Sequence, residues 1–217
     1  MIAVIQCASS KRPDAGHLLK GDGERVIFVA HPETAPADSG YIYARPDDKS
    51  DGAQSWREVL LKYNDTHASN PLGLLPAYRL YENATYGRLV ERFGVEKVFI
   101  LSAGWGLIRA DFLTPYYDIT FSPIARGRDA YKRRTKVDKY CDLCMLSDDT
   151  DEELIFFGGK DYVPLFCTLT SRVKGKRTIF HSAAQAPQAP GCVTVKFETT
   201  TRTNWHYECA RAFLKRI

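Results

Sequence analysis

The sequence lacks any run of about 18 apolar residues, which is close to the length that an α-helix needs to cross a bilayer, so we expect no transmembrane segment. Its 15 glycines and 11 prolines are too few for a collagen-like or disordered chain, because 44% of the 217 residues are hydrophobic. The N-terminus carries no charged segment ahead of an apolar one, so we expect no signal peptide and a cytoplasmic protein. The length is enough for one sizeable core.

Closely spaced cysteines are also scarce. Of the six cysteines, only Cys141 and Cys144 form a close pair. A chain without an export signal is expected to keep its thiols reduced, so we expect no disulfide framework. A structural zinc site needs about four ligands, and no second pair with matching spacing is present. The sequence therefore favours free thiols, and it predicts no metal site and no cofactor.

The net charge of +4 is small, but the charge is unevenly distributed. The segment Arg126–Lys139, called the basic strip below, contains seven cations and two anions. Its net charge of +5 leaves −1 for the rest of the chain. Six acidic residues follow between Asp142 and Glu153. A concentrated run of cations is typical of surfaces that neutralise phosphate.

Short β-branched or aromatic runs alternate with helical periodicity along the chain. Strands are expected at residues 2–6, 26–30, 40–44, 98–101, 154–157, 177–180 and 193–197, with 2–6 and 26–30 as central strands and 40–44 as an edge piece. Helices are expected at residues 56–63, 75–93 and 204–216, the second ending at Gly94. This alternation predicts a single α/β domain over residues 1–217, with a mostly parallel sheet and a charged insertion at about 125–153.

Ligands of open parallel sheets bind beyond the carboxyl ends of the strands, so the segments that follow the expected strands are candidate site loops. The first runs from Gln6 to Lys11. Backbone N–H groups of this turn, the hydroxyls of Ser9 and Ser10, and the Lys11 ammonium group suit an anion. The alternative is a simple exit from the strand with a capping serine.

The second candidate loop, residues 102–121, contains a carboxylate among aromatic residues. Trp105 lies between two glycines, and Tyr116 and Tyr117 precede Asp118. Aromatic rings beside a carboxylate suit a planar base held by stacking, and the candidate base-binding residues of the loop are Ser102, Gly104, Trp105, Tyr116 and Tyr117. The alternative is a packed loop in which Asp118 caps a turn.

The last two candidate loops follow the expected strands at 154–157 and 177–180. Gly158-Gly159 lets a helix N-terminus face a ligand, although simple turn chemistry explains the same pattern. Beside it, Lys160 is a candidate phosphate-binding residue and Tyr162 a candidate base-binding residue. His181 directly follows a strand, where a histidine can protonate or hydrogen-bond a leaving group. The alternative is a structural histidine.

The basic strip is a candidate phosphate-binding segment. Its cations, together with Tyr131 and Tyr140, suit phosphate neutralisation combined with stacking. The candidate phosphate-binding residues in it are Arg126, Arg128, Lys132, Arg133, Arg134 and Lys136. The alternative is a solvated face that pairs with the acidic residues after it.

Several of these segments resemble known families. The turn Cys-Ala-Ser-Ser-Lys at residues 7–11, the stretch Leu-Ser-Ala-Gly-Trp-Gly-Leu-Ile at 101–108, the Pro-Tyr-Tyr-Asp-Ile at 115–119 and the Gly-Gly-x-x-Tyr at 158–162 are similar to YaaA-like proteins and to the C-terminal part of archaeosine synthases. The resemblance covers about residues 1–165. It implies the uracil-DNA-glycosylase-like fold, a three-layer α/β/α arrangement with a nucleobase pocket at the strand ends.

The resemblance departs from the uracil-DNA glycosylases in two motifs. The Gly-Gln-Asp-Pro-Tyr motif is missing after the first strand, and His181-Ser182 replaces their His-Pro-Ser. Asp118, from the Tyr-Asp element of the relatives, therefore becomes the candidate catalytic carboxylate, with Gln6 and His181 as its partners. The expected activity is hydrolysis of the N-glycosidic bond of a modified, bulky base in DNA, in repair or phage defence. Alternatives are a non-catalytic nucleic-acid-binding stress protein, and a transferase or hydrolase of free nucleosides or nucleotides.

Overall fold

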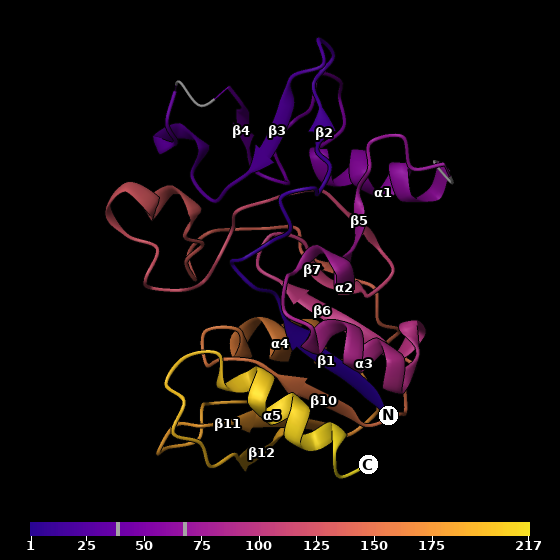
Figure 1. Cartoon of the computed structure of the whole chain (residues 1–217), viewed down its shortest axis with the longest axis vertical. Coiled ribbons are helices and arrows are strands. Elements are labelled where there is room, and N and C mark those ends of the chain that lie inside the picture. The colour runs from indigo at the N-terminus through magenta and orange to yellow at the C-terminus, as the bar shows by residue number, and fades with distance from the viewer. Residues whose placement is uncertain (38–39, 67–68) are drawn as a thin grey trace.

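A seven-stranded sheet forms the centre of the computed structural model, which describes residues 1–37, 40–66 and 69–217 (Figure 1). Its strand order is β12-β11-β10-β1-β6-β7-β9. The pair β6–β7 is antiparallel and the other neighbouring pairs are parallel, so the expected mostly parallel α/β sheet is confirmed. The bounds are β1 Ile2–Gln6, β6 Val98–Ser102, β7 Gly106–Arg109, β9 Leu143–Cys144, β10 Leu154–Phe157, β11 Arg177–His181 and β12 Val193–Lys196.

Helices cover both faces of this sheet. Successive side chains of a strand point to opposite faces. In β10, Phe156 stacks on Phe166 of α4 (Val163–Leu169), whereas Phe157 contacts Phe213 of α5 (Trp205–Leu214). Helix α3 (Thr85–Phe93) packs beside α5 (Figure 1). The central strands are therefore buried on both sides, which explains why β1, β6 and β10 are almost uninterrupted apolar runs.

Smaller sheets lie outside the main one. Strands β2 (Leu18–Leu19), β3 (Arg25–Phe28) and β4 (Ile42–Ala44) form a three-stranded sheet, β5 (Leu75–Pro76) pairs with β8 (Leu113–Thr114), and α1 spans Trp56–Thr66. The prediction of a central strand at 26–30 is therefore wrong. In β3 burial alternates, with Val26 and Phe28 buried and Arg25 exposed, as in a strand that is covered on one face. Phe28 packs edge-on against Trp105 at 5.0 Å, which joins the small sheet to the main core.

The expected helix over residues 75–93 is interrupted. Helix α2 (Ala77–Leu80) ends at Tyr81, whose backbone is extended and bridges to Lys11. The chain restarts as α3 after Asn83, because the Asn83 side chain accepts a hydrogen bond from the N–H of Thr85 at 2.9 Å. The predicted end at Gly94 is confirmed, and its φ of 86° is a conformation that favours glycine.

The segment predicted as a charged insertion is tied to the main sheet. It contains the 3-10 helix η3 (Gly127–Lys132), and the remaining 3-10 helices are η1 (Pro32–Thr34) and η2 (Val95–Lys97). Thr120 bridges to Arg133 ahead of β9, and β9 then pairs with β7. Gly106 makes this pairing possible, because a Cβ there would lie 2.3 Å from the carbonyl oxygen of Leu143. Among the helices of the described ranges, none is long and apolar enough to cross a bilayer.

Candidate functional site

A cavity of about 830 Å³ opens beyond the carboxyl ends of β1 and β10. Its walls are the turn after β1, the segment 118–132, the turn after β10 and the start of α5. In Figure 1 the segment 118–132 belongs to the salmon loop on the left, and the start of α5 is the yellow segment below it. Of the predicted site residues, six line the cavity: Gln6, Ser9, Ser10, Asp118, Lys132 and Tyr162. The cavity therefore lies at the sheet edge where parallel α/β folds bind ligands.

Gln6 is held in place at the end of β1. Its Oε1 accepts a hydrogen bond from the N–H of Gly159 at 2.6 Å, which joins the turns after β1 and β10. Its backbone carbonyl accepts a hydrogen bond from the hydroxyl of Tyr86 at 2.8 Å. Within the described part of the chain no acceptor pairs with Nε2 of Gln6, so this amide group is available to a ligand.

Asp118 enters the cavity from a segment anchored in the core. Its backbone N–H donates to the carbonyl of Phe28 at 2.7 Å, and the preceding Tyr117 is fully buried. The Asp118 carboxylate is 22% exposed and lies 3.0 Å from Nζ of Lys132. Lys132 also pairs with Asp129 at 2.7 Å. Burial opposes the charge of Lys132, but the hydrogen bonds to Asp129 and Asp118 raise its pKa above the ordinary value, so the ammonium group stays protonated.

Tyr162 and Cys7 are buried residues of the cavity lining. The Tyr162 hydroxyl lies 3.2 Å from Sγ of Cys7, and its ring packs edge-on against Phe121 at 5.0 Å. Burial raises the pKa of Tyr162 well above its ordinary value, so the phenol remains protonated. Ser9 and Ser10 are exposed at the entrance. A protonated phenol and two hydroxyls can each donate or accept a hydrogen bond.

The start of α5 is a wall of the cavity that the sequence analysis did not assign. Residues 202–207 line it, and Asn204 adopts a left-handed conformation with φ of 60° just before the helix. His206 lines the cavity yet is only 3% exposed. Its Nε2 is shielded from solvent and has no hydrogen-bond partner among the described residues. Helical periodicity predicted this helix, but a tertiary contact decides which of its residues reach the cavity.

His206 is expected to make the protein less stable in acid. Burial lowers its pKa from 6.5 to about 4. Between these values the unfolded chain binds a proton that the folded chain does not, so the free energy of unfolding falls as the pH is lowered through this window. The expected loss is on the order of 3 kcal/mol, since one pKa unit corresponds to about 1.4 kcal/mol.

Urea unfolding of the wild type and of His206→Phe, compared at about pH 7.5 and about pH 4.5, isolates this contribution from that of the carboxylates. The variant is expected to lose less stability on acidification than the wild type. An equal loss in both proteins would show that His206 does not titrate in this window.

The charged groups around the cavity are mostly acidic. Four carboxylates line it, those of Glu82, Asp118, Asp129 and Asp161, against two cations, Lys132 and Arg202. The difference of two negative charges disfavours a free anion inside the cavity and favours an uncharged or cationic group. The cavity is therefore better suited to a base or to a sugar that acquires positive charge than to a phosphate.

The segment 102–105 is structural and does not line the cavity. Ser102, Gly104, Trp105 and Tyr117 are buried, and Trp105 and Tyr117 have no exposed surface, so neither ring is available to stack on a base. The Ser102 hydroxyl donates to the Tyr117 hydroxyl at 2.9 Å and accepts from the N–H groups of Gly104 and Trp105. These residues therefore pack in the core, and the structure does not place them where they could bind a base as expected.

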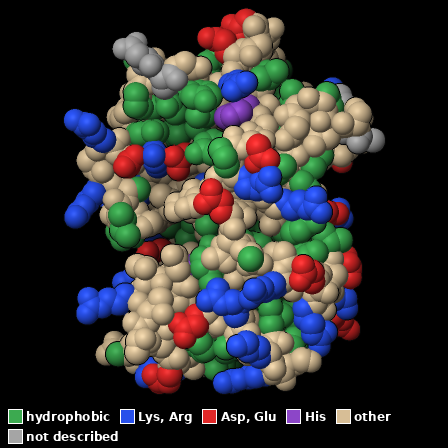
Figure 2. Space-filling model, in the orientation of Figure 1, with side chains coloured by type: hydrophobic (Ala, Val, Ile, Leu, Met, Phe, Trp, Pro, Cys, Tyr) green, Lys and Arg blue, Asp and Glu red, His purple; other side chains and the backbone are tan. Residues whose placement is uncertain are grey.

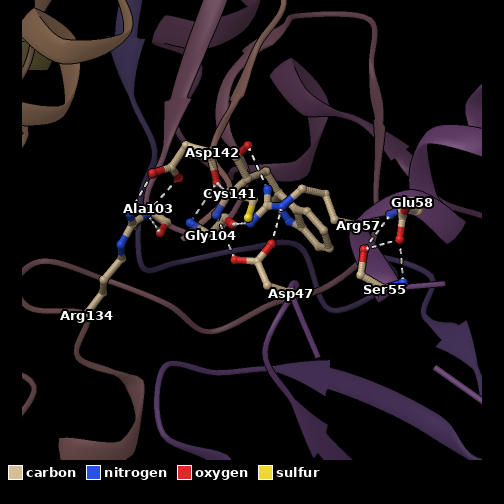
Figure 3. Close-up of polar contacts among 11 residues, drawn as sticks. Asp47, Ser55, Arg57, Glu58, Ala103, Gly104, Arg134, Cys141 and Asp142 are labelled. Carbon is tan, nitrogen blue, oxygen red and sulfur yellow. Dashed lines mark hydrogen bonds and ion pairs between the residues drawn. The ribbon is translucent and has the colours of Figure 1, made fainter. Parts of the chain in front are cut away.

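Two buried arginines hold this segment from opposite sides (Figure 3). Arg57 donates to the carbonyls of Trp105 and Gly104, both at 3.1 Å, and pairs with Asp47 at 2.6 Å. Arg134 donates to the carbonyl of Ala103 at 2.8 Å. It also pairs in bidentate fashion with Asp142, with distances of 2.8 and 2.6 Å.

Other predicted site residues also lie outside the cavity lining. His181 is 8% exposed, and its Nδ1 lies 3.2 Å from the carbonyl of Ala183. Lys11 is 7% exposed, donates to the carbonyls of Ala8 and Ser9 and lies 4.3 Å above the Tyr117 ring. Burial lowers the pKa of Lys11. Tyr116 is half-buried against His17, and Lys160 is exposed.

The basic strip divides into exposed and engaged cations. Arg126, Arg128 and Lys136 are exposed, and Figure 2 shows Lys and Arg side chains projecting from the edge where this segment lies. Lys132 and Arg134 are paired with carboxylates, so neither is a free phosphate contact. Arg133 is half-buried, and its Nε is shielded from solvent. Of the candidate phosphate-binding cations in the strip, Arg126, Arg128 and Lys136 are therefore the ones that remain exposed to a ligand.

Comparisons with protein-family models, with curated proteins and with solved structures found no match to this chain. A search of the described residues for groups of three or more metal-ligating side chains found none. Cys141 and Cys144 are exposed free cysteines.

Proposed function

We propose that the protein hydrolyses an N-glycosidic bond to a modified base in DNA, and that its fold is of the uracil-DNA-glycosylase-like type. The observation that carries this proposal is the convergence of Gln6 and Asp118 on one acidic cavity beyond the ends of β1 and β10. The volume of about 830 Å³ lies in the upper part of the usual ligand-pocket range, roughly 300–1,000 Å³, which suits a base that carries an additional substituent.

The reaction needs a negative charge near the sugar. As the bond from C1′ to the base breaks, its electron pair leaves with the base and positive charge develops on the sugar. The Asp118 carboxylate stabilises this charge and accepts a proton from the water that attacks C1′, while the departing base takes up a proton from solvent. Lys132 keeps Asp118 in one position through the 3.0 Å ion pair. The Gln6 amide orients the base or the attacking water.

A base can reach the cavity only if it leaves the DNA stack. Ile124 lines the cavity and is 75% exposed. It is followed by the exposed cations Arg126 and Arg128. This combination suits DNA, because an apolar side chain can fill the space of an extruded base while the arginines bind neighbouring phosphates.

Incubation of the purified protein with duplexes that each carry one modified base tests the proposal. Abasic sites are expected in at least one duplex, detected by strand cleavage in alkali. If none of the duplexes loses its base, the proposed activity is refuted. Release of base from free nucleosides, with little salt-dependent binding of DNA, would instead support the hydrolase of small substrates, which the acidic lining of the cavity also favours.

Charge reversal of the exposed arginines is expected to weaken DNA binding. Replacing both Arg126 and Arg128 with Glu removes two phosphate contacts, so the slope of log K against log salt should fall by about 2. Filter binding or fluorescence anisotropy over a range of salt concentrations measures this slope. Arg172→Glu is the matched control, because Arg172 is 82% exposed and lies outside the basic strip. Equal slopes for the double variant and the control would exclude Arg126 and Arg128 from DNA binding.

A further inference from the structure

We infer that the first turn of α5 is the wall of the cavity that recognises the base, and that His206 donates or accepts a hydrogen bond with an uncharged ring nitrogen or carbonyl group of that base. This inference rests on the proposed function and names the group that reads the substrate. His206 replaces His181 and Trp105, which the sequence indicated for the base and which the structure places outside the cavity lining.

The surroundings of His206 explain its packing but leave one polar atom without a role. The ring lies against Tyr207, with 4.0 Å between centroids, and meets Trp205 edge-on at 6.4 Å. Aromatic packing alone would be satisfied by phenylalanine. The imidazole instead brings a buried Nε2 that no described residue pairs with, and an unpaired buried polar atom is unfavourable. The part of the ring that is exposed borders the cavity, so a turn of the imidazole about its Cβ–Cγ bond would present Nε2 to a ligand, which would supply the missing partner.

The protonation state of His206 indicates the kind of group that it binds. Because burial lowers its pKa to about 4, the imidazole is uncharged at neutral pH. A neutral imidazole offers one donor and one acceptor, which matches the mixed donors and acceptors along the edge of a base. The acidic lining of the cavity also disfavours a phosphate at this position.

Hydrogen bonds fix this wall relative to the end of β1. The Tyr207 hydroxyl lies 3.1 Å from the Tyr86 hydroxyl, which in turn donates to the backbone carbonyl of Gln6 at 2.8 Å. His206 directly precedes Tyr207, so its backbone position is coupled through this chain to Gln6. A base between the two would meet the Gln6 amide and the His206 ring as a fixed pair, which is the arrangement that discriminates between bases.

The test uses short oligonucleotides that differ at one central position. The series carries the four common bases, uracil and 5-methylcytosine, and a tetrahydrofuran abasic analogue serves as the base-free probe. Ring nitrogen signals of His206 are followed by NMR in the full-length wild type. Binding constants are measured for the wild type, His206→Phe, His206→Gln and the control His17→Phe, which alters a half-buried histidine outside the cavity lining.

We expect at least one base-containing probe to shift the His206 signals, and the base-free probe not to shift them. His206→Phe should bind that probe about 10-fold more weakly, as loss of one hydrogen bond implies, and should bind the base-free probe as the wild type does. His206→Gln, which retains hydrogen-bonding groups, should recover part of the affinity. His17→Phe should bind like the wild type.

The inference is overturned if no probe shifts the His206 signals, or if His206→Phe binds the base-containing and base-free probes with wild-type affinity. The wild-type NMR measurement decides this even if the phenylalanine variant does not fold. Base-dependent binding through His206 without any base release would refute the proposed activity and support this inference. Base release that is unchanged in a folded His206→Phe variant would refute the inference alone.

Discussion

Asp118→Asn is expected to lower the rate of base release by about 10²–10⁴-fold, the usual contribution of a positioned acid–base group. The amide keeps the shape of the side chain but can neither stabilise positive charge on the sugar nor take a proton from water. The fold should survive, because Asp118 holds Phe28 through its backbone N–H and Lys132 retains Asp129 as a partner. Single-turnover release of base from the duplex that the wild type cleaves measures the change.

The matched control is Asp111→Asn. Asp111 also pairs with a cation, Arg109 at 3.0 Å, but is 42% exposed and lies outside the cavity lining. Its variant should react at the wild-type rate. Near-normal turnover by Asp118→Asn would remove Asp118 from the mechanism. If Asp118→Asn bound DNA and supported function in the cell, the non-catalytic binding protein would become the better interpretation.

Arg57→Met is expected to destabilise the fold by about 3–5 kcal/mol, which is the usual effect of removing one partner from a buried ion pair. The side chain of Arg57 is 5% exposed, and its loss leaves the carbonyls of Trp105 and Gly104 without their donor and Asp47 without its cation. For a domain of this size the melting temperature should fall by roughly 6–20 °C. Urea unfolding and thermal melting measure both quantities.

Arg109→Met is the control for the loss of a guanidinium group. Arg109 is 54% exposed and its pair with Asp111 faces solvent, so the free energy of unfolding should change by less than about 1 kcal/mol. If Arg57→Met were as stable as Arg109→Met, the buried arginine would not be what holds the 103–105 turn. Arg57→Met should weaken DNA binding only to the extent that it unfolds the protein, because Arg57 does not line the cavity.

The main sheet could be predicted from the sequence because its central strands are bounded, continuous apolar runs. That pattern occurs where a strand is covered on both faces, and residues 2–6, 98–101 and 154–157 show it. The same criterion wrongly predicted residues 26–30 as a central strand. Burial alternates along this strand because its sheet is covered on one face only. The criterion also missed β7, since Gly106–Arg109 contributes a strand by hairpin pairing with β6 and not by its own composition.

The candidate site was predictable only in part. Gln6 and Asp118 were identified because strand ends and their loops meet at one sheet edge. Trp105 between two glycines suggested an exposed ring, but the ring is buried. Arg57 holds the backbone of this segment in the core, and it is 47–48 residues away in the sequence from the carbonyls that it binds. His206 gave no local signal, because only the packing of α5 against the sheet brings it to the cavity. Long-range polar contacts of this kind leave no periodic trace in a sequence.

The segment 120–143 is attached to the core at both ends. Its attachment and the length and charge of its middle part can therefore change independently in evolution. The bridge between Thr120 and Arg133, the pair of Arg134 with Asp142 and the pairing of β9 with β7 fix its two ends on the core. Between them, the exposed arginines at 126 and 128 lie on a closed loop. Each doubling of loop length costs only about 0.6 kcal/mol of closure entropy, so insertions near residue 127 would alter the reach and charge of this loop and leave its two attached ends in place.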